Sequence, residues 1–179
     1  MTNYVALLRG INVGANKRVA MSDLRDALGA LGMREPRSLL NSGNLVFGAE
    51  ANATALETLL EREFAKRLGL QTKVFVRSAR DWKRAIAANP FIDEAKDDPS
   101  HLIVMFLKAK PAARTFAALG KAITGPERIL PGGTQAYITY PDGIAGSRLT
   151  NALIDAKLGT PGTGRNWNTV LKLNALLGG

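Results

Sequence analysis

The chain of 179 residues contains no cysteine and only one histidine, His101. Without cysteine it can form no disulfide, thiolate metal site or iron–sulfur cluster, and it has no cysteine nucleophile. A single histidine also excludes a metal site built from several histidines. The lack of cysteine is compatible with a reducing compartment, and we expect a cytoplasmic location.

Long apolar runs are also missing. No stretch approaches the roughly 18 apolar residues of a membrane-spanning helix. No basic segment precedes the short apolar run at residues 2–8, as a signal peptide would require. We therefore expect a soluble protein with no membrane partner. Hydrophobic residues make up 46% of the chain, which is enough for a core in one generous domain or two small ones.

Acidic residues are few, so the formal net charge is +9. None occurs before Asp23, whereas Arg9, Lys17 and Arg18 lie in that opening segment. A basic surface is typical of proteins that bind nucleic acid, nucleotides or phosphorylated metabolites. The alternative is that the positive charge serves solubility alone.

Hydrophobic periodicity in the first half predicts the element order β-α-β-β-α-β. The expected strands are residues 3–8, 37–40, 45–48 and 72–77. Ser22 is the expected cap of the first helix and Gly32 its end. Asn52 or Thr54 is the expected cap of the second helix, and Gly69 its end. This order predicts a split-βαβ, ferredoxin-like arrangement, with two helices on one face of an antiparallel sheet.

The second half repeats most of this order. We expect strands at 102–107, 127–130 and 135–140, a helix opening at Pro111, and a helix that includes Leu149, Ala152, Leu153 and Ala156. The last strand is missing from the pattern, because a Gly/Pro loop at 159–164 leads to a terminal helix from about Arg165. A helix near Trp82 bridges the halves, and the acidic stretch at 90–100 is interpreted as a solvated linker in preference to a cation site.

These elements predict an α+β protein with two tandem ferredoxin-like (α-β plait) subdomains. Both have antiparallel sheets, the second is atypical, and a C-terminal helix follows. We expect the first subdomain at residues 1–78 and the second, with the bridging helix, at 79–179. The sequence repeat is too weak to prove a duplication, and it leaves the arrangement of the subdomains undetermined.

Two loops of the first subdomain are the main candidates for a site. The first follows strand 3–8, and the second is the turn between strands 37–40 and 45–48. In a split-βαβ sheet both loops lie at the same end, so we expect them to be neighbours. The candidate ligand-binding residues are Arg9, Gly10, Asn12, Gly14, Lys17 and Arg18 in the first loop and Ser42, Gly43 and Asn44 in the second.

The composition of this rim is complementary to an anion. Its glycines allow a ligand to come close to the backbone, and amide groups are supplied by Asn12, Asn16 and Asn41. Arg9 could grip a carboxylate or phosphate through two parallel hydrogen bonds. The alternative is that glycine and asparagine are present only because turns require them. Neither loop has the spacing of a P-loop or a dinucleotide fingerprint, so no cofactor is identified.

A third candidate segment is Thr163–Thr169, which contains Arg165, Asn166, Trp167 and Asn168. Thr163 or Asn166 could cap the last helix, whose free N–H groups would favour an anion. Trp167 could stack on a base, or it could begin an apolar stripe that continues through Val170. Whether this segment joins the two loops in one site is left open by the sequence.

No set of residues in the sequence meets the requirements of a catalytic or metal centre. His101 has no motif around it, and we interpret it as a partly exposed structural histidine. Ser42 has no identifiable base beside it, and its context is not a nucleophile elbow. No metal site is expected, the cofactor is unknown, and the question of catalysis is left open.

Three segments carry a family resemblance: Tyr4–Gly14, Asn41–Phe47 and Thr163–Val170. They resemble the signature segments of a bacterial family of uncharacterised proteins, domain of unknown function 1697. The resemblance covers essentially the whole chain and implies two tandem ferredoxin-like subdomains. It implies no activity and no residue roles. Matching residues are Arg9, Gly10, Asn12, Gly14, Ser42, Gly43, Asn44, Arg165, Asn166, Trp167 and Asn168. Ala15 and Arg18 depart from the usual glycine and lysine.

Three functional hypotheses follow. The leading one is a protein that binds an anionic ligand, namely nucleic acid, a nucleotide or a phosphorylated metabolite, at the loop rim. An RNA-recognition sheet is poorly supported, because residues 45–48 offer only Phe47 for stacking. The alternative is an enzyme acting on a phosphorylated or carboxylated small molecule without metal–thiolate or histidine chemistry. A third is a protein–protein adaptor, which nothing in the sequence favours. The oligomeric state is undetermined.

Overall fold

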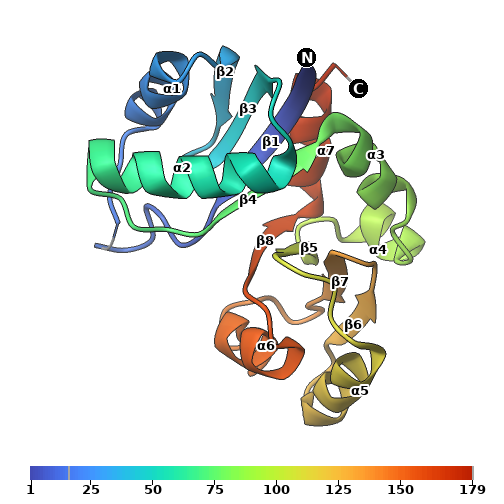
Figure 1. Ribbon diagram of the computed structural model, residues 1–179. Coiled ribbons are helices and arrows are strands. Elements are labelled where there is room, and N and C mark those ends of the chain that lie inside the picture. Colours follow the sequence, from blue (N-terminus) through green and yellow to red (C-terminus); the bar gives the residue numbers. More distant parts are fainter. Residues whose placement is uncertain (16, 179) are drawn as a thin grey trace. The chain divides into compact units, whose positions relative to one another are not determined.

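The structure, a computed structural model, describes residues 1–15 and 17–178 (Figure 1). The chain divides into two compact units. One unit consists of Met1–Arg84 and Leu173–Gly179, and the other of Ala85–Lys172. They are called unit 1 and unit 2 below. The expected boundary after residue 78 stays a prediction. Among the described residues, no helix combines the length and the hydropathy needed to cross a membrane.

Unit 1 has the predicted order of elements. They are β1 (Thr2–Leu8), α1 (Met21–Ala30), β2 (Arg34–Leu39), β3 (Asn44–Ala49), α2 (Ala53–Leu68) and β4 (Val74–Ser78). The sheet has the order β2-β3-β1-β4 with antiparallel neighbours (Figure 1). Strands β1 and β2 therefore run in the same direction, with β3 between them running back. The predicted ferredoxin-like fold is confirmed for this unit.

The core of unit 1 lies between the sheet and the two helices. Alternate residues of β1 face it, because side chains of a strand point to opposite faces in turn. Tyr4, Ala6 and Leu8 pack there with buried residues of α1 and α2 such as Leu28 and Phe64.

The predicted helix caps of unit 1 were only partly correct. Asn52 caps α2 by accepting from Ala55 N at 2.9 Å, and Gly69 ends it in a left-handed conformation. The prediction for α1 was wrong, because Ser22 lies inside the helix. The N-cap is Ala20, which has no side-chain acceptor.

Unit 2 contains a second sheet of the same topology. Its elements are α4 (Ile92–Asp97), β5 (Leu102–Leu107), α5 (Ala113–Ala122), β6 (Arg128–Pro131), β7 (Gln135–Thr139), α6 (Asn151–Leu158) and β8 (Gly162–Asn166). Helices α3 (Ala79–Ala87) and α7 (Trp167–Leu176) each belong in part to both units. The strand order is β6-β7-β5-β8, again with antiparallel neighbours. The α+β fold with two ferredoxin-like subdomains is therefore confirmed.

The prediction that the second subdomain lacks its last strand was wrong. Residues Gly162–Asn166 form β8, an edge strand paired with β5. Glycine is a poor strand former, which hid the strand from the sequence pattern. Glycine fits at these two positions because β5 leaves no room for a side chain. A Cβ on Gly162 would lie 2.9 Å from Leu107 Cδ2, and one on Gly164 would lie 2.8 Å from Ile103 Cγ2.

The acidic stretch at 90–100 is also more ordered than a linker, because it contains helix α4. Backbone hydrogen bonds show how closely the two units repeat one another. Leu8 N, at the end of β1, donates to Gly43 O at 2.8 Å, and Leu107 N, at the end of β5, donates to Thr134 O at 2.8 Å. The structural repeat that the sequence pattern indicates is thus present in the backbone of both units.

Candidate functional site

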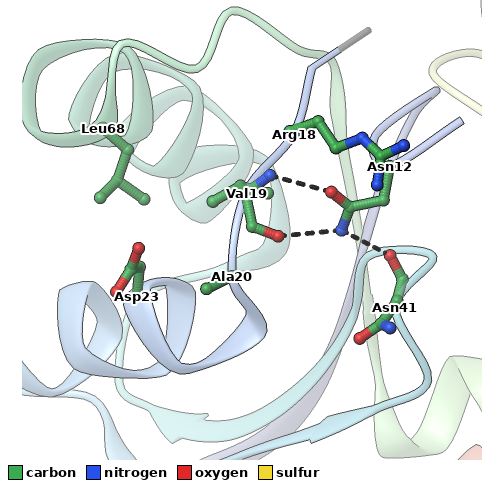
Figure 2. Close-up of a pocket in the computed structure, with 7 residues that line it drawn as sticks. All are labelled: Asn12, Arg18, Val19, Ala20, Asp23, Asn41 and Leu68. Carbon is green, nitrogen blue, oxygen red and sulfur yellow. Dashed lines mark hydrogen bonds between the residues drawn. The ribbon is translucent and has the colours of Figure 1, made fainter. Parts of the chain in front are cut away.

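The two loops predicted to be neighbours are joined by a side chain. Asn12 Nδ2 donates to Asn41 O at 2.7 Å, so the loop after β1 contacts the turn between β2 and β3 (Figure 2). This contact confirms the inference from topology that both loops lie at one end of the sheet. We call the segment 9–20 the β1–α1 loop.

Asn12 also closes the β1–α1 loop on itself. Its Oδ1 accepts from Val19 N at 2.9 Å, and its Nδ2 donates to Val19 O at 2.9 Å (Figure 2). The residue has a left-handed backbone, with φ 53°, a conformation that asparagine tolerates better than most residues. Both amide hydrogens are thus used within the protein. Asn12 shapes the loop, and a direct contact with a ligand stays a prediction.

The turn at 41–44 is shaped mainly by packing. Asn44 is fully buried, and its Nδ2 donates to Leu39 O at 2.9 Å and to Ser42 Oγ at 2.9 Å. Gly43 has φ 82°, and a Cβ there would lie 2.8 Å from Leu8 Cβ. The interpretation that this turn uses glycine and asparagine for structural reasons therefore has direct support. Its role in ligand binding stays a prediction.

The β1–α1 loop is longer than the fold requires. It spans twelve residues, 9–20, whereas the equivalent connection in unit 2 spans only five, 108–112. The same strand-to-helix step can therefore be made with a much shorter chain. Binding residues are often placed on such loops, which a rigid scaffold positions.

A pocket of about 520 Å³ lies beside this loop. Its lining residues are Asn12, Arg18, Val19, Ala20, Asp23, Asn41 and Leu68. Figure 2 shows that they come from the loop, the start of α1, the 41–44 turn and the end of α2. Asp23 and Leu68 were not among the predicted site residues, because no local pattern indicates that the end of α2 approaches the start of α1.

One basic residue, Arg18, lines this pocket, and Arg9 and Lys17 belong to the same loop. Lys17 and Arg18 are exposed, and Arg9 is half-buried where β1 ends. The Arg9 backbone is fixed on both sides, since its N–H donates to Lys73 O at 3.1 Å and its carbonyl accepts from Thr72 Oγ1 at 2.7 Å. Gly10 and Gly14 are exposed and have φ of 63° and 58°. Asn16, expected to supply an amide to the rim, lies outside the described residues.

The third predicted segment lies in unit 2, on β8 and at the start of α7. Arg165 is 9% exposed, and its Nη1 donates to Thr163 Oγ1 at 2.8 Å and to Gly164 O at 2.8 Å. Burial lowers the pKa of Arg165 to about 10, because a charged group is less well solvated there.

At the start of α7, Asn166 Oδ1 accepts from Thr169 N at 3.0 Å, so of the two predicted caps it is Asn166 that binds the first turn. Trp167 is 7% exposed and begins a buried stripe with Val170, while Asn168 is exposed. This burial agrees with the packing interpretation of the tryptophan. That Arg165, Asn166, Trp167 and Asn168 bind a ligand stays a prediction.

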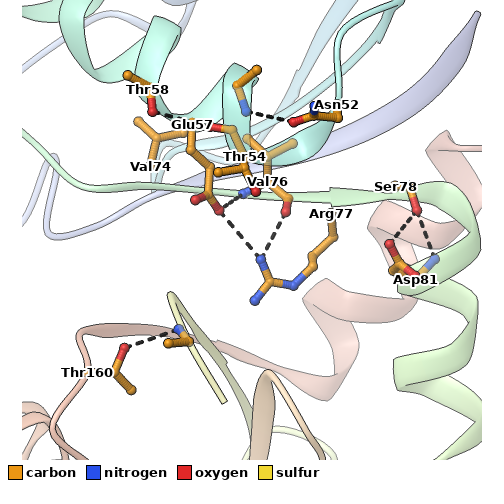
Figure 3. Close-up of polar contacts among 12 residues, drawn as sticks. Asn52, Thr54, Glu57, Thr58, Val74, Val76, Arg77, Ser78, Asp81 and Thr160 are labelled. Carbon is orange, nitrogen blue, oxygen red and sulfur yellow. Dashed lines mark hydrogen bonds and ion pairs between the residues drawn. The ribbon is translucent and has the colours of Figure 1, made fainter. Parts of the chain in front are cut away.

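Arg77 occupies in unit 1 the position that Arg165 occupies in unit 2. It pairs with Val5 across β4 and β1, as Arg165 pairs with Val104 across β8 and β5. Arg77 Nη1 donates to Val76 O at 2.9 Å and lies 3.6 Å from Glu57 Oε1 (Figure 3). Burial lowers the pKa of Arg77, and the Glu57 carboxylate opposes that shift. The sequence motifs did not single out this residue.

Two other predictions can be compared with the structure. No group of three or more His, Asp or Glu residues that could hold a metal occurs in residues 1–15 and 17–178. Phe47, the one aromatic residue considered for an RNA-recognition sheet, is 1% exposed and belongs to the core under the helices. Its ring centroid lies 6.2 Å from that of Tyr4. Phe47 is therefore not available for stacking on a base.

Comparisons with known proteins agree with the fold. The solved structure of the conserved bacterial protein SP0830 from Streptococcus pneumoniae is similar, with a TM-score of 0.75 and 23% identity over 98% of each chain. No curated protein matches the sequence. Residues 1–137 match the family model described as a protein of unknown function, DUF1697. Because this match covers more than half of the chain, the protein belongs to the DUF1697 family.

Proposed function

We propose that the protein binds an anionic ligand, a nucleotide or phosphorylated metabolite in particular, in the pocket beside the β1–α1 loop. The observation that carries the proposal is the loop itself. It is seven residues longer than its counterpart in unit 2 and brings Arg18 to a pocket of about 520 Å³. That volume lies within the roughly 300–1,000 Å³ of small-molecule sites.

Backbone strain supports the same location. Among the described residues, the non-glycine residues with positive φ are Asn12, Lys17, Glu35 and Leu40. Two of these lie in the β1–α1 loop, and Leu40 directly precedes Asn41. Strained conformations persist where the surrounding structure enforces them and cluster at binding sites.

Charge supports an anion as the ligand. Arg18 lines the pocket, Lys17 is exposed beside it in the sequence, and the whole chain carries +9. The N-cap of α1, Ala20, lines the pocket and makes no side-chain cap, and the positive end of a helix dipole favours an anion. Asp23 lines the pocket as well. The Asp23 carboxylate repels an anion, so the proposal requires the ligand to bind near Arg18 in spite of this repulsion.

Opposite charge changes in the pocket test the proposal. Nucleoside monophosphates and sugar phosphates are screened by thermal shift and then titrated by calorimetry. A ligand at 100 times its Kd should stabilise the fold by about 2.7 kcal/mol. Arg18→Ala should weaken binding and Asp23→Asn should strengthen it, each a few-fold. Arg114→Ala, which removes an exposed arginine from α5, should do neither. If the two pocket variants bind like the wild type, the site is misplaced.

Nucleic acid is the other anionic ligand that this rim could take. Its binding would rest on phosphate contacts, so log Kd should rise by roughly 0.7–0.9 per log unit of salt for each phosphate contacted. Gel-shift titrations at 50 mM salt with single- and double-stranded probes would test this version. If no probe binds at 50 mM salt, the nucleic-acid version is excluded and only the small-molecule version is left.

An enzymatic role remains the alternative, and the pocket narrows its chemistry. The titratable side chains among the lining residues are Arg18 and Asp23. An enzyme at this site would therefore have Asp23 as its acid or base. A cytoplasmic location is part of the same proposal, and the absence of cysteine supports it.

A further inference from the structure

The connection between β7 and α6 in unit 2 is much longer than its counterpart in unit 1. It spans eleven residues, 140–150, whereas the equivalent connection between β3 and α2 spans only three, 50–52. The two units therefore carry their long loops at different places, since in unit 1 the β1–α1 loop is the extended one. The shared fold does not require the extra residues of the β7–α6 loop, and loops of this kind often carry binding residues.

A cavity of about 380 Å³ lies beside the β7–α6 loop. It is lined by residues of this loop and of the connection from α5 to β6, all of which belong to unit 2. The volume falls within the roughly 300–1,000 Å³ of small-molecule sites. The cavity is thus large enough for a small molecule, and its charged lining residues are Glu127, Asp142 and Arg148.

A hydrogen bond joins the two segments that line the cavity. Ser147 Oγ donates to Glu127 Oε1 at 2.6 Å and accepts from Leu149 N at 3.1 Å. The other carboxylate oxygen lies against Gly125, where an added Cβ would collide with Glu127 Oε2. Glu127 is therefore held in place by its neighbours. Because a carboxylate has about four lone-pair sites, it can still accept a hydrogen bond from a ligand.

Charges of both signs line the cavity. Glu127 and Asp142 contribute two carboxylates, and Arg148 contributes a guanidinium. Asp142 and Arg148 are exposed and, among the residues that the structure describes, neither is engaged in an ion pair. Both charges are therefore available to a ligand. A molecule that carries an ammonium and a carboxylate group has a partner for each of them.

Other ligand classes match this lining less well. A phosphate or a nucleotide would bring its negative charge close to two carboxylates. A simple amine would leave Arg148 without a partner. The described residues that line the cavity include no aromatic side chain on which a base could stack. The lining therefore favours a small zwitterion over an anion, a cation or a nucleoside.

We propose that this cavity binds a small zwitterion, namely a free α-amino acid or a dipeptide. Arg148 binds the carboxylate of the ligand through two parallel hydrogen bonds, as its planar guanidinium allows. The ammonium group of the ligand donates to Glu127 and Asp142. Ser147 is a positioning residue, because it acts through Glu127. This site is separate from the pocket in unit 1 and does not depend on the function proposed for that pocket.

Binding of amino acids to the whole chain tests the ligand class. The probes are the twenty common α-amino acids and their glycyl dipeptides, screened by thermal shift and then titrated by calorimetry. We expect at least one probe to bind with a Kd of about 1 mM or lower. The matching amine, without the carboxylate, and the matching acid, without the amino group, should each bind roughly ten-fold more weakly. No binding in this range, or an analogue that binds as tightly as its parent, would overturn the proposal.

Removal of one charge at a time should have a selective effect. Arg148→Ala should weaken binding of the amino acid by roughly three- to ten-fold but should not weaken binding of the amine. Asp142→Asn should weaken binding of the amino acid in the same range but should not weaken binding of the acid. Arg114→Ala and Asp97→Asn, which remove exposed charges elsewhere in unit 2, should bind like the wild type. Loss of both analogues in either pocket variant would contradict the assigned orientation of the ligand.

Ser147 provides a test of the positioning role. Ser147→Ala should weaken binding of the amino acid, because Glu127 loses the hydroxyl group that holds it, and Ser147→Thr should retain binding. Arg18→Ala, which alters the pocket of unit 1, should leave binding of the amino acid unchanged. Thermal unfolding without ligand shows whether each variant is folded. Unchanged binding in Ser147→Ala would contradict the positioning role, and weaker binding in Arg18→Ala would place the amino acid in unit 1.

Discussion

Asn12 and Asn41 lie on different loops, and the side-chain amide of Asn12 donates a 2.7 Å hydrogen bond to the carbonyl oxygen of Asn41. Two further bonds join the same amide group to Val19. One side chain therefore holds the long loop closed and ties it to the neighbouring turn. This arrangement makes the loop sensitive to a change at position 12.

Asn12→Ala should destabilise the fold by about 2–3 kcal/mol. It removes three hydrogen bonds, each worth roughly 0.5–1.5 kcal/mol, and it forces alanine into a left-handed conformation. Asn12→Gly removes the same bonds but tolerates that conformation. We therefore expect Asn12→Ala to be less stable than Asn12→Gly by about 1 kcal/mol in urea unfolding. Equal stability of the two variants would mean that the backbone relaxes out of the left-handed region.

Gly43→Ala should be the more damaging of two glycine substitutions in the loops. Gly43 and Gly10 both have positive φ, but a Cβ on Gly43 would lie 2.8 Å from Leu8 Cβ, whereas one on Gly10 meets nothing within 4 Å. Strain alone should cost Gly10→Ala about 1–2 kcal/mol. The added overpacking should cost Gly43→Ala roughly 1–3 kcal/mol more.

Urea unfolding of the two variants measures this difference. Gly10→Ala serves as the control for the left-handed conformation, because it changes φ preference without a clash. If both variants lose the same free energy of unfolding, Leu8 and the 41–44 turn can move apart at little cost in free energy. The packing account of the 41–44 turn would then be wrong.

Glu57→Ala should cost more stability than Glu61→Ala. Both carboxylates come from α2 and cover the outer edge of β4. Glu57 accepts from Val76 N at 2.9 Å (Figure 3), and Glu61 accepts from Val74 N at 2.9 Å. Glu57 also lies 3.6 Å from Arg77 Nη1, in a pair whose side chains are 12% and 13% exposed. Removing it should cost about 2–4 kcal/mol, since a mostly buried cation loses its partner.

Glu61→Ala is the matched control, with an expected loss of about 1 kcal/mol for one hydrogen bond. Chemical denaturation of both variants gives the comparison. The double variant with Arg77→Met tests the cause, because removing the cation should recover part of the stability lost in Glu57→Ala. No recovery would show that the edge of β4, and not the ion pair, accounts for the loss.

Glu63 should make the stability of the protein depend on pH in the acidic range. Its carboxylate accepts from Arg67 Nε at 3.1 Å and from Arg62 Nε at 3.1 Å. Both hydrogen bonds lower the pKa of Glu63 below its ordinary value, and the bond from Arg67 has the larger effect. A carboxyl group with a lowered pKa in the folded state stabilises the fold above its unfolded pKa, and this stabilisation is lost as the pH falls through the folded pKa.

Denaturation of the wild type and Glu63→Gln between pH 7 and pH 3 measures this contribution. We expect the wild type to be more stable at pH 7 and the difference to shrink as the pH falls below about 4.3, the ordinary value for a glutamate. Salt should reduce the difference as well, because the two arginines are exposed. A difference that stays constant over this range would mean that the carboxylate charge is not its cause.

The parts of the fold that could be predicted from sequence are those with local hydrophobic patterns. Strand β5, with six buried apolar residues, and α2, with its asparagine cap and glycine end, are examples. The neighbourhood of the two loops could be predicted too, because it follows from strand order. The pocket could not be foreseen in the same way, since Leu68 and Asp23 reach it only through the packing of α1 and α2.

Strand β8 shows why the remaining part could not be predicted. Its sequence, GTGRN, has no apolar alternation, and it forms because β5 offers an edge with matching space. Gly164→Ala should therefore destabilise unit 2, although alanine is normally tolerated better than glycine in a strand. A Cβ at this position would lie 2.8 Å from Ile103 Cγ2, and overpacking of this kind costs roughly 1–3 kcal/mol.

A double-mutant cycle with Ile103→Ala isolates that contact. Ile103→Ala alone should lose about 2–4 kcal/mol through the cavity that it creates. In the double variant, Gly164→Ala should cost almost nothing further, because the methyl group that it meets is gone. The two effects should therefore be non-additive by 1 kcal/mol or more, as expected for residues in contact. Additive losses in urea unfolding would show that the glycine serves the backbone of β8 and not the side chains of β5.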